Sequence, residues 1–345
     1  MVPVLPLPAL LVPLLLGLSQ AVLFGARLGE NITAAKQAAR GEPCQQTIRV
    51  VGSDQRMPAV GYTITRKYER MERDTQVPGI TNFLKAGGRL IAAERPGYSL
   101  GYRYVDEAIR NTQLRRADVW VTSKFEPISM PMFGIRTWMA TQIDKNLETL
   151  GLTYVDVMYL NLGNYVTSES IKRSEHITAW RGMIDAKEAG KVRNLGVHQH
   201  TRKEIEALVN ATGVWPAVAL VWLSPFMPKE QLEYVQWLQK SNIAVMAYGF
   251  LSWSSYDDLY AQDTMSTAKR VLDRHQGATM PQLVIRWLLD KNVAVVTDMS
   301  NPAHLDEDLH CLPGSVDTTD ADVLSTAKRD CGFYEKKQPL MGCHP

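Results

Sequence analysis

The sequence predicts an α/β fold, a (β/α)8 TIM barrel preceded by an N-terminal β-hairpin. From about Val119 onward, short apolar and β-branched runs alternate with longer amphipathic segments, which is typical of repeated βα units and a parallel sheet. No low-complexity linker interrupts residues 47–330, so the alternation belongs to one domain. A chain of 345 residues accommodates such a barrel, commonly ~250 residues or more, together with an N-terminal extension.

Eight segments are expected to form the barrel strands. Each is short and mostly apolar, with few charged residues. The segments are residues 60–64, 89–92, 119–122, 155–160, 194–197, 217–221, 243–248 and 293–296. Residues 47–51 and 57–60 flank a Gly-Ser-Asp-Gln turn and predict the hairpin. The first helix is expected at residues 80–86, where Gly87-Gly88 ends it. Apolar residues at helical spacing predict a core-facing stripe that comprises Ile135, Trp138, Met139, Ile143, Leu147 and Leu150.

The N-terminal segment is expected to direct the chain to the secretory pathway. Residues 1–25 contain no charged side chain, and Ser19 and Ala21 have the spacing of a signal-peptide cleavage site. We therefore expect residues 1–21 to be a signal peptide that leaves a lumenal or secreted protein. The alternative is a membrane anchor, because the uncharged segment approaches the ~20 residues of a spanning helix. On this division residues 22–46 form a linker, 47–335 the barrel and 336–345 a C-terminal tail.

Two further patterns relate to this compartment. Asn31-Ile32-Thr33 and Asn210-Ala211-Thr212 are acceptor tripeptides for N-glycosylation if the chain enters a secretory lumen. The four cysteines, which show no C-x-x-C spacing, are Cys44, Cys311, Cys331 and Cys343. Their even number permits disulfides, and a bridge would hold the tail in an oxidising compartment. Four free thiols are the alternative.

Composition and charge exclude some classes of function. A hydrophobic fraction of 45% and a charged fraction of 21% are ordinary for a globular protein. The 38 Lys and Arg residues nearly balance the 36 Asp and Glu residues, and no basic run offers a track for phosphates. We therefore expect no nucleic-acid partner.

In barrels of this kind the chemistry lies in the loops at the carboxyl ends of the strands. The residues at those positions are 92–98, Lys124, Asn161, 198–200, Trp222, Tyr248 and 297–299. His198 and His200 have a spacing that suits metal binding, but no third ligand is evident, so we predict no metal site.

The chain resembles the aldo-keto reductases, a NADPH-dependent barrel family that reduces carbonyl groups by hydride transfer from the nicotinamide. The resemblance spans about residues 47–330. It is carried by Met57-Pro58-Ala59-Val60-Gly61, by Val119-Trp120-Val121-Thr122-Ser123-Lys124, by residues 154–160 and 190–197, and by Pro225 and Ala247-Tyr248. Each segment alone is weak, and together they are fairly specific.

The resemblance implies a catalytic group of four side chains: a Tyr acid, a Lys that lowers its pKa, an Asp that pairs with the Lys, and a His that orients the carbonyl. A phenol with a pKa of about 10 becomes a useful acid near neutrality only beside a cation, and a buried Lys stays charged only beside an anion. The Lys matches Lys124, for which a solvated charge is the alternative. The His position is Asn161, whose amide can donate a hydrogen bond but cannot titrate.

The other two catalytic positions are altered. The Asp position, after Arg89-Leu90-Ile91, is Ala92. Glu94 lies two residues on, points to the same strand face if the strand continues, and is the substitute partner for Lys124. Tyr98 is the nearest candidate for the acid and Tyr102 the second, although the family's spacing is not kept. Packing of either ring in a loop over the barrel is the alternative.

On the cofactor side the resemblance implies that Tyr248 stacks on the nicotinamide and that Gln199 bonds its carboxamide. His198-Gln199 replaces the family's Ser-Asn pair, and Ala219-Leu220 replaces its Asn-Gln pair. The family grips the 2′-phosphate of NADPH with a Pro-Lys-Ser stretch and a later Arg; here Thr297-Asp298-Met299 and His304 occupy those positions. We therefore expect weak NADPH binding, with Glu307 as the remaining adenine contact.

Three hypotheses follow. The first is a pseudoenzyme that keeps the barrel as a binding or structural subunit, with a protein partner and membrane association through residues 1–25. The second is an active, altered reductase that reduces a small carbonyl substrate with NADH or loosely held NADPH. The third is unrelated chemistry on the same scaffold, because fold alone does not fix function.

Overall fold

The structure is a computed structural model, and it describes most of the barrel. The described residues are 44–64, 73–93, 104–125, 134–161, 173–250, 266, 269–275, 278–310, 312, 316 and 319–320. The chain divides into two units, Met1–Glu42 and Pro43–Pro345, and all described residues belong to the second. Three candidate site residues, Glu94, Tyr98 and Tyr102, lie outside the described residues, as does the N-terminal segment.

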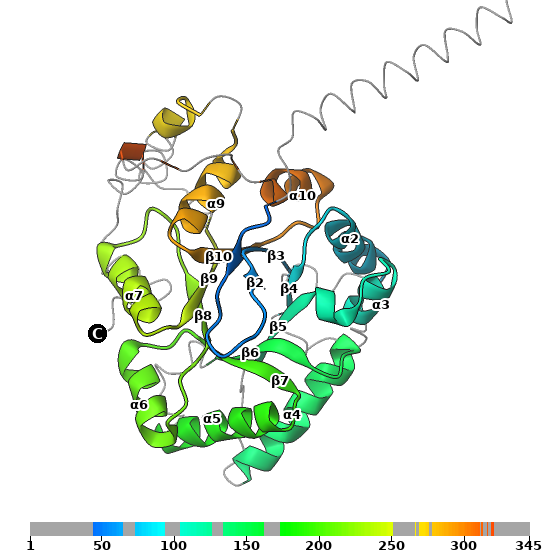
Figure 1. Cartoon of the computed structure of the whole chain (residues 1–345), viewed down its shortest axis with the longest axis vertical. Coiled ribbons are helices and arrows are strands. Elements are labelled where there is room, and N and C mark those ends of the chain that lie inside the picture. The colour runs from blue at the N-terminus through cyan, green and yellow to red at the C-terminus, as the bar shows by residue number, and fades with distance from the viewer. Residues whose placement is uncertain are drawn as a thin grey trace, which may run out of the picture. The chain divides into compact units, whose positions relative to one another are not determined.

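Eight parallel strands form a closed barrel with helices around it, as the sequence predicts (Figure 1). Neighbouring strands follow the chain order, and the last strand closes onto the first through the pair Val295 and Val60. The strands are β3 Val60–Thr63, β4 Leu90–Ala93, β5 Trp120–Phe125, β6 Val155–Asn161, β7 Val192–His198, β8 Val218–Trp222, β9 Ala244–Tyr248 and β10 Val293–Thr297. Most are buried on both faces, since the barrel interior and the helix layer cover them.

The helices pack outside the strands. They are α2 Arg73–Lys85, α3 Tyr104–Arg110, α4 Ile135–Leu150, α5 Arg173–Glu188, α6 Arg202–Thr212, α7 Lys229–Lys240, α9 Met280–Asp290 and α10 Pro302–Leu309, with a short 3-10 turn, η2 Arg116–Asp118. The predicted stripe on α4 is buried, apart from the partly buried Trp138. Among the described residues, no helix is long and apolar enough to cross a membrane.

The predicted start of the first helix was wrong. Helix α2 begins at Arg73 rather than at residue 80, and Pro78 lies inside it. Proline removes one backbone hydrogen bond from a helix and is usually a boundary signal. Here the helix continues because Val77 and Ile80, on either side of Pro78, are buried in the core.

The hairpin closes the amino-terminal end of the barrel. Strand β1 Thr47–Ile48 pairs antiparallel with β2 Met57–Pro58, so the hairpin is shorter than predicted. Its turn reaches the start of β7, where Arg193 Nη1 donates to Gln55 Oε1 at 3.3 Å. The carboxyl ends of the strands, where the candidate residues lie, are at the opposite end.

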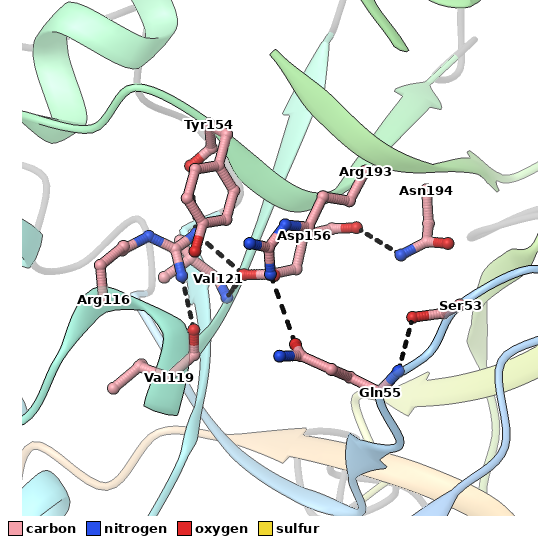
Figure 2. Close-up of polar contacts among 9 residues, drawn as sticks. All are labelled: Ser53, Gln55, Arg116, Val119, Val121, Tyr154, Asp156, Arg193 and Asn194. Carbon is pink, nitrogen blue, oxygen red and sulfur yellow. Dashed lines mark hydrogen bonds and ion pairs between the residues drawn. The ribbon is translucent and has the colours of Figure 1, made fainter. Parts of the chain in front are cut away.

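The buried carboxylate of Asp156 links several segments at this amino-terminal end of the barrel (Figure 2). Asp156, 1% exposed, accepts hydrogen bonds from Arg116 Nη2 at 2.8 Å, from the Val121 amide at 2.9 Å and from Arg193 Nη1 at 3.1 Å. The Tyr154 ring contacts both guanidinium groups, whose carbons lie 4.1 Å and 3.9 Å from its centroid. Three segments of the fold are therefore joined through one side chain.

Cys44 is disulfide-bonded. Its backbone amide also donates to Leu309 O at 2.8 Å, which holds the start of the barrel unit against α10. The other three cysteines lie outside the described residues. The alternative of four free thiols is therefore wrong.

Candidate functional site

Lys124 faces the interior of the barrel near the carboxyl end of β5. The neighbouring Ser123 points outward, because its hydroxyl donates to Asn146 Oδ1 of helix α4 at 3.0 Å. Successive strand residues point to opposite faces, so Lys124 points inward. The residue is 8% exposed, which excludes the alternative of a fully solvated charge.

Asn161 also lies inside the barrel, at the end of β6. Tyr159, two residues earlier, points inward, because its hydroxyl lies 4.0 Å from Met246 Sδ on β9. Asn161 is in register with His198 of β7, and His198 Nδ1 lies 2.8 Å from Asn161 Oδ1. Since the amide oxygen accepts from the imidazole, the amide NH2 is the donating end of Asn161.

The aromatic side of the site is formed by Tyr248, His198 and Trp222. The rings of His198 and Tyr248 are 5.2 Å apart at an angle of 67°, and Gln199 Nε2 lies 3.4 Å from the Tyr248 hydroxyl. Trp222 Nε1 donates to Gly249 O at 3.1 Å. Gly249 has a φ of +63°, and a Cβ there would lie 2.8 Å from the Trp222 ring, so a glycine is required.

The structure places Ala92 inside the barrel, beside the strand that carries Lys124. Ala92 pairs in register with Thr122, which shares the inward face with Lys124. Ala92 is fully buried, and Thr122 Oγ1 is buried without a hydrogen-bond partner among the described residues. The Ala92 side chain therefore supplies no carboxylate, and the Thr122 hydroxyl lies on the same inward face next to it.

Acidic side chains gather after β10. Asp298 Oδ1 accepts from the Ser300 amide at 3.1 Å, and Asp308 accepts from the Thr297 hydroxyl at 2.9 Å. Burial, with a smaller contribution from repulsion by Glu307 and Asp298, raises the pKa of Asp308 to about 7. Glu307 is partly buried on the same helix, α10.

Two buried histidines form a pair that the sequence did not predict. His176 on α5 and His200 after β7 lie 2.9 Å apart through their Nε2 atoms. His200 Nδ1 lies 3.0 Å from His198 O, which can only accept, so His200 Nε2 must accept from His176. His200 is thus hydrogen-bonded to His176, and His198 is hydrogen-bonded to Asn161. Among the described residues no group of three or more His, Cys, Asp or Glu side chains could hold a metal.

A cavity of about 430 Å³ lies at the other end of the barrel, between the hairpin turn and the start of β7. Its walls include Ser53, Gln55, Lys187, Arg193 and Asn194. In barrels of this kind the catalytic residues lie at the carboxyl ends of the strands. This cavity lies at the opposite, amino-terminal end, so it is not part of the candidate active site.

The profile of the Aldo/keto reductase family matches residues 61–323, a stretch that includes all eight strands except the first residue of β3. The chain belongs to the aldo/keto reductase family. The predicted resemblance is confirmed.

The chain is similar to several relatives and solved structures. It is 25% identical to the NAD(P)H-dependent D-xylose reductase I,II of Candida tropicalis, over 84% of this chain and 94% of that protein. It is 26% identical to 2,5-diketo-D-gluconic acid reductase B of a Corynebacterium species, over 73% and 89%. An aldo/keto reductase structure from Brucella melitensis superposes with a TM-score of 0.65 at 23% identity, over 81% of this chain and 100% of the other. An aldo-keto reductase complexed with NADPH gives a TM-score of 0.68 at 14% identity, over 88% and 98%.

The histidine pair should make the stability of the fold sensitive to acid. Burial lowers the pKa of His200, and it lowers the pKa of His176 to about 2, against about 6.5 in an unfolded chain. Below pH ~6.5 the unfolded chain therefore binds more protons, and stability falls as the pH drops from there toward 2. The expected loss between pH 6.5 and 5 is about 2 kcal/mol for His176, measured by urea unfolding.

Two variants isolate this effect. His176→Gln keeps an amide donor for His200 Nε2 and should lose about 2 kcal/mol less than the wild type between pH 6.5 and 5. His304→Gln, which replaces an exposed histidine, should lose as much as the wild type. If the free energy of unfolding falls by the same amount between pH 6.5 and 5 in His176→Gln and in the wild type, the pair does not titrate as described.

Proposed function

We propose that this aldo/keto reductase reduces small aldehydes or ketones with a nicotinamide cofactor. The proposal rests on one observation: Lys124, Asn161 and Tyr248 face the barrel interior near the carboxyl ends of β5, β6 and β9. The names of two relatives support it, an NAD(P)H-dependent D-xylose reductase and a 2,5-diketo-D-gluconic acid reductase. A structure with the same fold has NADPH bound.

The residues at the mouth of the barrel fit a nicotinamide ring. Tyr248 offers an aromatic face, and the Gln199 amide, held near the Tyr248 hydroxyl, can bond a carboxamide. The cofactor would supply a hydride to the carbonyl carbon. Tyr248 and Gln199 would orient the nicotinamide ring next to the carbonyl carbon.

The protein's own groups would then handle the carbonyl oxygen. The Asn161 NH2, oriented by the bond from His198, would donate to that oxygen. Tyr98 would give it a proton, and the Lys124 cation would lower the pKa of that phenol. Glu94 would offset the charge of Lys124 in place of the missing Asp at Ala92.

The adenosine end of the site favours NADH over NADPH. A 2′-phosphate placed as the family resemblance implies would meet Asp298, with Glu307 and Asp308 on the adjoining helix. One carboxylate about 4 Å from a dianion costs roughly 2 kcal/mol even in water, which is at least tenfold in affinity. Glu307 can instead contact the adenine, as the resemblance implies.

Titration with each cofactor tests this proposal. The full chain should bind NADH on the order of tenfold more tightly than NADPH by fluorescence or calorimetry, and should oxidise bound NADH when an aldehyde is added. Asp298→Lys should reverse the preference, whereas Asp144→Lys, the same charge change on exposed α4, should leave it unchanged. Absence of binding for both cofactors would contradict the proposal.

A second candidate is a barrel that binds a ligand or protein partner without turnover. It is favoured by Ala92, which occupies the position of the family's Asp, and by the acidic side chains at the position of the family's phosphate site. On this candidate both cofactors fail to bind. The same titration therefore distinguishes the two.

A further inference from the structure

Asn210 stands exposed in the last turn of α6, within the acceptor tripeptide Asn210-Ala211-Thr212. The helix buries Ile205 and Leu208 against the barrel. At 100° per residue, Asn210 lies about 200° around the helix from Leu208, on the face turned to solvent. Its side-chain amide is accessible in the folded protein.

The neighbourhood of Asn210 is firmly packed on its inner side. Arg181 Nη2 donates to Ala211 O at 3.3 Å, and Trp180 Nε1 donates to Val214 O at 3.3 Å, so α5 holds the end of α6 in place. The two contacts involve backbone carbonyls and leave the Asn210 side chain uninvolved. A group attached to Asn210 would project outward and displace neither contact.

The direction of α6 places Asn210 far from the candidate active site. Strand β7 ends at His198, at the carboxyl end of the barrel, and α6 runs back from Arg202 to Thr212 before β8 starts. Asn210 therefore lies at the amino-terminal end, opposite to Lys124 and Asn161. A bulky substituent there would leave the mouth of the barrel open.

A separate observation indicates the compartment. Cys44 is disulfide-bonded, and structural disulfides persist in oxidising compartments such as a secretory lumen. Residues 1–25, without a charged side chain, have the composition of a segment that targets that lumen. Attachment of N-linked glycans takes place in the same lumen.

We propose that Asn210 carries an N-linked oligosaccharide and that the chain matures in an oxidising secretory lumen. The donor class is a polyprenyl-diphosphate-linked oligosaccharide. Asn210 Nδ2 forms a bond to the anomeric carbon of the first sugar, the bond from that carbon to the diphosphate oxygen breaks, and the amide loses one proton. The polyprenyl diphosphate leaves with the electron pair, so nothing is oxidised or reduced. The proposal is independent of the reductase function.

The test is made on the full chain expressed in a eukaryotic cell with a secretory pathway. Asn31→Gln removes the other acceptor, and the chain should still lose the mass of one glycan after digestion with a peptide N-glycosidase. The released peptide should show deamidation at Asn210 by mass spectrometry. Absence of a mass shift in Asn31→Gln would overturn the proposal.

Matched variants at the tripeptide complete the test in the Asn31→Gln background. Asn210→Gln and Thr212→Val should each abolish the shift, because one removes the amide and the other the hydroxyl that acceptor recognition requires. Thr212→Ser keeps that hydroxyl and should retain the shift. A shift that persists in both Asn210→Gln and Thr212→Val would place the glycan elsewhere and overturn the assignment.

Discussion

Replacing Asp156 with alanine should lower the free energy of unfolding by about 3–5 kcal/mol. The substitution removes the acceptor for Arg116, for Arg193 and for the Val121 amide together. The Arg116 side chain is only 19% exposed, so its charge would be left largely buried without a counterion. Urea unfolding monitored by tryptophan fluorescence measures the loss.

A matched control separates this from the general effect of losing an ion pair. Asp144 pairs with Lys191 at 2.5 Å, but both side chains are more than a third exposed. Asp144→Ala should therefore cost less than about 1 kcal/mol. If Asp156→Ala and Asp144→Ala cost the same, the buried carboxylate does not hold the amino-terminal end of the barrel.

Lys124→Met should reduce turnover by roughly 10²–10⁴-fold, the usual contribution of proton transfer by a positioned acid. Methionine fills a similar buried volume but carries no charge, so the phenol that protonates the carbonyl oxygen would lose its cation. We expect cofactor affinity to change little, because the loss concerns the acid. Steady-state kinetics and cofactor titration measure the two quantities separately.

Lys229→Met is the control for that variant, since Lys229 is an exposed lysine at the start of α7. It should keep the wild-type turnover. Both variants should keep the wild-type unfolding midpoint to within a few degrees, which shows that the fold is intact. An undiminished rate in Lys124→Met would remove Lys124 from the mechanism.

Most of the barrel could be predicted from the sequence because parallel strands are buried on both faces. Segments such as 293–296 therefore read as continuous apolar runs, and β10 differs from that prediction by one residue, Thr297. The start of α2 could not be predicted, because Pro78 is a boundary signal and only packing of Val77 and Ile80 overrides it.

The positions of Lys124, Asn161 and Tyr248 could be predicted because each lies at or near the end of a recognisable strand. Their partners could not, since the sequence does not give strand register. Asn161 contacts His198 because the register of β6 and β7 places these two residues opposite each other. His176 and His200 are 24 residues apart, on a helix and a loop, and no local signal joins them.

Hydride transfer itself is the most direct test of the reductase account. The full chain is incubated with NADH or NADPH that carries deuterium at the transferring carbon of the nicotinamide, together with a small aldehyde, and the alcohol is analysed by mass spectrometry. We predict one deuterium on the carbinol carbon of the product for the wild type and far less for Lys124→Met. Unlabelled product, or no product although the cofactor is bound, would contradict the account.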